Sequence, residues 1–71
     1  MEKHIGIVET SNDSVLTIIK RDNFLIAGDS TNCGVREMHS IEIDDCFSFD
    51  ENLSCFIEMI EEFENAQLNL N

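Results

Sequence analysis

Residues 48–66 read S-F-D-E-N-L-S-C-F-I-E-M-I-E-E-F-E-N-A, and they carry the clearest structural pattern in the chain. Apolar side chains recur there at intervals of three and four residues, which places them on one side of a helix with a period of 3.6 residues. These residues are Leu53, Phe56, Ile57, Ile60 and Phe63. Glutamates occupy most of the other side. The pattern predicts an amphipathic helix from Ser48 to about Ala66.

The start of this helix has the spacing of a capping box. The hydroxyl of Ser48 can accept a hydrogen bond from the amide three residues on, while the carboxylate of Glu51 reaches back to the amide of Ser48. Asp50 and Glu51 also place negative charge at the positive end of the helix dipole. We therefore expect the helix to begin at Ser48.

The segment before the helix contains short runs rich in β-branched residues, separated by turn residues. Residues 4–10, 15–20 and 24–27 are predicted strands, and residues 11–14 and 21–23 are predicted turns. Such short turns leave no room for a crossover, so the three strands form an antiparallel meander.

A fourth strand is predicted within residues 35–44, where Ile41 and Ile43 alternate with acidic residues and should point inward. Residues 28–34, G-D-S-T-N-C-G, are predicted to be a loop framed by glycines. The expected fold is a single α+β domain over residues 1–71. It consists of a three- to four-stranded antiparallel β-meander followed by one C-terminal helix packed on one sheet face.

The two middle strands are apolar on both faces, which suggests a binding surface. If the turns centre on residues 12–13 and 22–23, one face shows Ile5, Ile7, Leu16, Ile18, Leu25 and Ala27. The other face shows Val8, Val15, Ile19, Phe24 and Ile26. One helix covers only one of these faces, the sequence leaves open which one, and the uncovered apolar face marks an interface. We expect a homodimer or a bound partner on the second set, unless the C-terminal tail or the segment 28–36 folds over it.

The charge of the chain is strongly negative, with fifteen acidic residues, four basic residues and a net charge of -11. From Glu37 onward there are ten acidic residues and no lysine or arginine. Such a chain repels nucleic acid and acidic membranes, and it is attracted to basic protein surfaces. The carboxylates of Glu58, Glu61 and Glu62 on the helix are the candidate contacts. Acidic residues also keep small proteins soluble without any further role.

The sequence contains no recognisable catalytic motif. His4 and His39 are the two imidazoles, and neither belongs to a nucleophile signature, although His39 and Cys46 could approach each other. The loop 28–34 lacks the lysine of a phosphate-binding loop. We expect no enzymatic activity and no cofactor.

A cluster of carboxylates in residues 44–51 raises the question of a metal site. Asp44, Asp45, Asp50 and Glu51 could collect around Ca²⁺ or Mg²⁺, but the spacing and the missing glycine do not fit an EF-hand. We expect no specific metal site, and the pattern leaves open whether these four side chains bind a cation.

Localisation and function are expectations from composition. No apolar run approaches a membrane span, the N-terminal residues lack the apolar core of a signal peptide, and three cysteines form no disulfide framework, so we expect a cytoplasmic protein. The expected function is a small acidic non-enzymatic interaction module that self-associates or binds a basic protein. The alternative is a nucleic-acid mimic, of phage or mobile-element type, that inhibits a nucleic-acid-binding protein.

Overall fold

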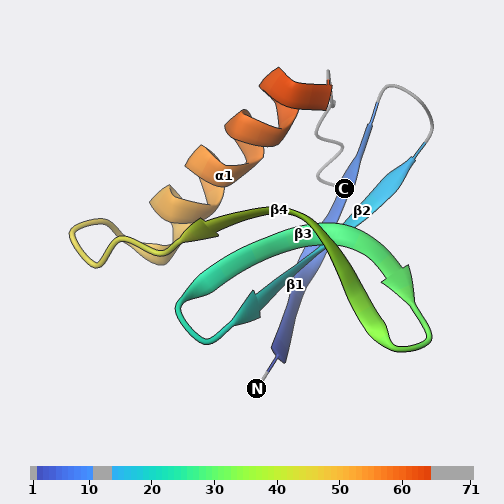
Figure 1. The fold of residues 1–71 in the computed structure, drawn as a ribbon. Helices are drawn as coiled ribbons and strands as arrows, with labels where there is room; N and C mark the ends of the chain where they lie inside the picture. Colours follow the sequence, from blue (N-terminus) through green and yellow to red (C-terminus); the bar gives the residue numbers. More distant parts are fainter. Residues whose placement is uncertain (1, 11–13, 65–71) are drawn as a thin grey trace.

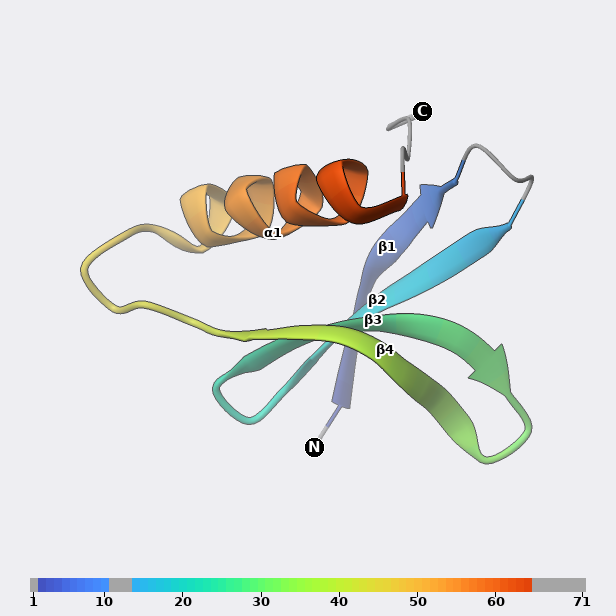
Figure 2. The ribbon, with the colours of Figure 1, turned by 45° about the horizontal axis from the view of Figure 1, so that its top comes forward.

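The computed structural model describes residues 2–10 and 14–64 of the chain. It contains an antiparallel sheet of four strands in the order β1-β2-β3-β4, followed by one helix (Figure 1). The elements are β1 (Glu2–Glu9), β2 (Val15–Arg21), β3 (Phe24–Thr31), β4 (Gly34–Glu42) and α1 (Phe49–Glu64). The helix lies across one side of the sheet (Figure 2). The expected α+β meander with one C-terminal helix is confirmed.

The capping box at the start of α1 is present as expected. The amide of Ser48 donates to Glu51 Oε1 over 3.1 Å, and the amide of Glu51 donates to Ser48 Oγ over 3.1 Å. These two bonds satisfy amides that have no partner within the first helical turn. The helix continues to Glu64, and the expected end at Ala66 lies outside the described residues.

The core forms where the apolar side of α1 meets the sheet. Phe56 and Ile60 are completely buried, and Ile57 is nearly so. They pack with side chains from the first three strands, and Leu53, Met59, Ile41 and Ile43 pack around the edge of the same cluster. The sheet residues of the core are Val8, Leu16, Ile18, Leu25 and Ala27. The inward orientation expected for Ile41 and Ile43 is thus confirmed.

Phe63 departs from the expected helix pattern, because it is 74% exposed. Its ring lies 6.2 Å from the ring of His39 in β4 instead of entering the core. β4 bends away from the helix on the hairpin side of His39, where its register with β3 shifts (Figure 2). Phe63 therefore lies outside the core, and the prediction of a five-residue buried stripe was wrong at its end.

A bulge in β1 changes which of its side chains enter the core. His4 pairs with Ile19 and Gly6 pairs with Ile18, so Ile5 is an extra residue that shifts the alternation. Ile5 and Val8 consequently both pack with the core, while Ile7 is 48% exposed. The expected faces of Ile7 and Val8 were wrong, because strict alternation along a strand holds only without a bulge.

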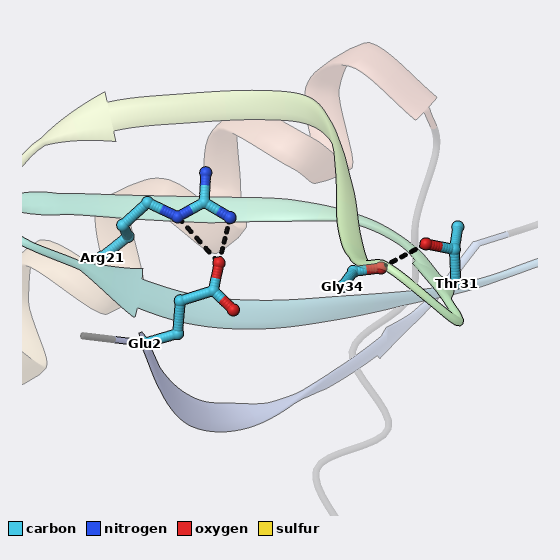
Figure 3. A network of polar contacts seen from close by, with 4 residues as sticks. All are labelled: Glu2, Arg21, Thr31 and Gly34. Atoms are coloured by element: carbon cyan, nitrogen blue, oxygen red, sulfur yellow. Dashed lines mark hydrogen bonds and ion pairs between the residues drawn. The ribbon is translucent and has the colours of Figure 1, made fainter.

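Residues 28–34 do not form the expected loop. β3 continues through Thr31, and residues 32–33 make a two-residue turn into β4 at Gly34. Gly34 has a φ of 113°, which glycine adopts without steric cost. The hydroxyl of Thr31 donates to the carbonyl of Gly34 over 2.6 Å and accepts from the amide of Cys33 over 3.2 Å (Figure 3). The polar residues in this segment are exposed strand residues of a long hairpin.

Gly28 allows the hairpin of β3 and β4 to bend. The register shifts between Ala27 and Gly28 because Met38 is an extra residue in β4. An ideal Cβ built on Gly28 would lie 1.7 Å from the carbonyl oxygen of Arg36 and 3.2 Å from the amide nitrogen of Met38. By alternation from Ile26, this Cβ would point to the side of the sheet opposite α1. The β4 backbone therefore crosses over Gly28 on that side, at a distance that only glycine permits.

We predict that Gly28→Ala lowers the free energy of unfolding by at least about 2 kcal/mol, because the added methyl forces the β4 backbone to move. Gly6→Ala is the matched control, since a Cβ at Gly6 meets no atom within 4 Å. Chemical denaturation followed by circular dichroism measures both. Equal effects of the two substitutions would contradict the assigned close approach.

Candidate interaction surface

The side of the sheet opposite α1, called here the open face, follows from the strand registers. Side chains that alternate with the core residues point to this side, and they form rows across the strands. The two rows nearest the turn between β2 and β3 are Glu2–Arg21–Phe24–Glu42 and His4–Ile19–Ile26–Ser40. The next row is Ile7–Thr17–Gly28–Glu37, and beyond it Glu9 pairs with Val15.

An apolar stripe runs diagonally across the open face. Ile7, Val15 and Phe24 are 48%, 47% and 43% exposed, respectively. Between them lie Ile19 and Ile26, which are only 4% and 3% exposed although no helix covers this side. The stripe is therefore a buried centre flanked by three half-exposed apolar side chains.

The stripe contains four of the five apolar residues predicted for a partner surface. Val15, Ile19, Phe24 and Ile26 lie on the open face, as the sequence predicted. Val8 does not, because it is 1% exposed and packs in the core beneath α1. The bulge at Ile5 moved it there. Ile7 takes the place of Val8 on the open face. The sign of the bulge in the sequence is Gly6, which interrupts an otherwise regular strand.

Charged side chains border the stripe. Arg21 forms an ion pair with Glu2, with Arg21 Nε donating to Glu2 Oε1 over 2.8 Å (Figure 3). Both side chains are about two-fifths exposed, so the pair contributes little to stability. Glu37 and Glu42 are exposed on the β4 side of the same face. The border is thus mainly acidic.

The acidic residues of α1 do not form an uninterrupted row. Glu58 and Glu62 are exposed and one helical turn apart, whereas Glu61 is half-buried. The exposed positions of the preceding turn are taken by Ser54 and Cys55. Of the three carboxylates predicted for partner contact, two therefore point fully to solvent.

The loop between β4 and α1 is held in one conformation by Asn52. This side chain is 5% exposed, and its Oδ1 accepts from the amide of Asp44 over 2.8 Å. Its Nδ2 donates to the carbonyls of Asp44 at 3.0 Å, Phe47 at 3.4 Å and Ser48 at 2.9 Å. One buried amide thus ties both ends of the loop to the first turn of the helix. The spacing of sequence motifs did not reveal this role, because Asn52 lies within the predicted helix.

The same loop is joined to the turn between β2 and β3. The amide of Ile43 donates to the carbonyl of Asn23 over 2.8 Å, and Asn23 Nδ2 donates to the carbonyl of Ile43 over 3.2 Å. Asp22 in that turn has a φ of 54°, which suits a two-residue hairpin connection. The loop and the turn therefore lie at the same end of the molecule (Figure 1).

The predicted carboxylate cluster has structural roles in this loop. Asp44 Oδ1 accepts from the amide of Cys46 over 2.9 Å, and Glu51 caps the helix with Ser48. Within residues 2–10 and 14–64, no group of three or more histidine, cysteine, aspartate or glutamate side chains is arranged to hold a metal ion. Cys33, Cys46 and Cys55 are exposed and reduced.

We predict that Asn52→Asp lowers the free energy of unfolding by about 2–4 kcal/mol, because a carboxylate at this buried position has no N–H to donate and faces carbonyl oxygens. Asn32→Asp in the exposed β3–β4 turn makes the same chemical change and should cost less than about 0.5 kcal/mol. Thermal and urea denaturation of both variants give the comparison. A small loss of stability in Asn52→Asp would show that the loop does not depend on this side chain.

Comparisons with known proteins identify no similar protein. No protein-family model matches the chain, and searches of curated proteins and of solved structures find no match. Among the described residues, α1 is too short and too polar to cross a membrane.

Proposed function

We propose that the protein is a non-enzymatic interaction module that binds a protein partner through its open face. The observation that supports this most is the apolar stripe, where Ile7, Val15 and Phe24 are nearly half exposed around the buried Ile19 and Ile26. Protein interfaces commonly have an apolar centre and a polar border, and on the open face the exposed side chains of Ile7, Val15 and Phe24 are bordered by charged residues.

The charge around the stripe favours a partner with basic residues at its border. The protein carries a net charge of -11, and three of its four basic side chains contact acceptors within the chain. Arg21 pairs with Glu2, Arg36 pairs with Asp29 at 2.5 Å, and Lys20 donates to the carbonyl of Asp22 at 2.8 Å. A second copy of the chain would place one acidic border against another, which costs free energy.

We predict that the double substitution Ile7→Ser and Val15→Ser weakens partner binding at least tenfold and leaves the fold intact, because both side chains are half exposed. Phe63→Ser is the control, since it removes an exposed apolar side chain from the end of α1. A partner captured from the native cell is purified, and its Kd for each variant is measured by titration calorimetry. Equal affinity of the double variant and the wild type would refute the proposal.

Sedimentation tests whether the partner is a second copy of the chain. We expect a monomer in 0.15 M NaCl, and a dimer dissociated by the Ile7 and Val15 substitutions would identify a second copy as the partner.

The salt dependence of partner binding separates an apolar interface from a charged one. Binding of a partner through the apolar stripe should persist in 0.5 M NaCl. Mimicry of nucleic acid by the carboxylates should be lost there, because salt screens exposed charges.

A further inference from the structure

We propose that the loop before α1 is a docking site for a basic amphipathic helix of another protein. The site is the aromatic end, defined as Phe47 and Phe49. Their side chains are 57% and 37% exposed. The proposal extends the proposed function, but Phe47 and Phe49 lie outside the open face and can be tested separately from it.

The loop that carries Phe47 is fixed at one end of the molecule by a bond to a separate segment. The backbone of Asn23, in the turn between β2 and β3, is bonded to Ile43 at the start of the loop. Phe47 is the residue before the helix cap, and Phe49 begins α1. Figures 1 and 2 show the loop and the start of α1 at the same end of the fold as the turn between β2 and β3.

The loop presents Phe47 in a preformed conformation. Asn52 bonds the carbonyl of Phe47, and the amide of Phe47 donates to the carbonyl of Asp44 over 3.2 Å. The backbone on both sides of this exposed ring is therefore already ordered before a partner arrives. A preformed site binds more tightly, because less conformational entropy is lost on association.

The charge of the aromatic end identifies the chemistry of its partner. Exposed acidic residues flank the phenylalanines in the loop and the first turn of α1, namely Asp44, Asp45, Asp50 and Glu51. No lysine or arginine occurs in the loop or in α1. Apolar rings among carboxylates are complementary to leucine side chains among lysines or arginines.

The backbone of the aromatic end favours a helical partner over an extended one. β4 ends at Glu42, and the next amide, that of Ile43, already donates to Asn23. The loop amides of Asp44, Cys46 and Phe47 are bonded within the chain as well. An extended partner would find few backbone amides here that are free to form hydrogen bonds. A helical partner forms its backbone hydrogen bonds internally and binds through its side chains.

The test uses a synthetic 18-residue peptide of leucine and lysine, with leucine at helical positions i, i+3, i+4 and i+7. A peptide with serine in place of leucine has the same charge without the apolar side. Fluorescence anisotropy gives the Kd of each peptide for the wild type, Phe47→Ser and the control Phe63→Ser. We expect Phe47→Ser to weaken the leucine peptide about five- to tenfold and Phe63→Ser to change it less than twofold. The serine peptide should bind more weakly and be insensitive to Phe47→Ser.

Asp45→Lys provides a second variant that leaves the rings in place, and it should also weaken the leucine peptide. Chemical shift changes of backbone amides on peptide addition should concentrate in residues 43–50. Equal effects of Phe47→Ser and Phe63→Ser, or shift changes centred on Glu58 and Glu62, would overturn the proposal. The double substitution of Ile7 and Val15 leaves these residues unchanged, so its effect on partner binding reports on the open face alone.

Discussion

The packing of one short helix against one side of a four-stranded sheet is the constraint on which the rest of this structure depends. Phe56 and Ile60 are fully buried between α1 and the sheet, and each contributes on the order of 2 kcal/mol of apolar burial. A helix of 16 residues covers a single side. The opposite side has no helix over it, and there Ile7, Val15 and Phe24 are half exposed around the buried Ile19 and Ile26.

The regular elements could be predicted from the sequence, because their signals are local. The apolar period of residues 53–60, the Ser48–Glu51 cap and the β-branched runs each determine an element without reference to the rest of the chain. The two bulges could not be predicted, since an extra residue at Ile5 or Met38 depends on pairing with a neighbouring strand. The bulge at Ile5 exchanged Ile7 and Val8 between the two faces. The sequence predicts a loop for residues 28–34 because this segment has no apolar side chain except Cys33, and the pairing that makes it a hairpin lies between β3 and β4.

The candidate surface was predictable in part for the same reason. Alternation along β2 and β3 correctly grouped Val15, Ile19, Phe24 and Ile26 on one face, and the structure shows that the helix covers the other face. Alternation does not reveal depth, however, and Ile19 and Ile26 are nearly inaccessible. The buried amide of Asn52 was also invisible, since its partners are backbone carbonyls of a loop whose path depends on where β4 ends. Features that arise from contacts between segments require the structure.

The central claim is that the helix covers the face with Val8 and leaves the face with Ile7 and Val15 in solvent. Paramagnetic relaxation of side-chain methyl groups by a soluble gadolinium chelate measures this directly. The account predicts strong relaxation for the methyls of Ile7 and Val15 and weak relaxation for those of Val8 and Leu16. Strong relaxation of Val8 together with protection of Ile7 would show that β1 has no bulge, and it would contradict both the assigned open face and the surface proposed on it.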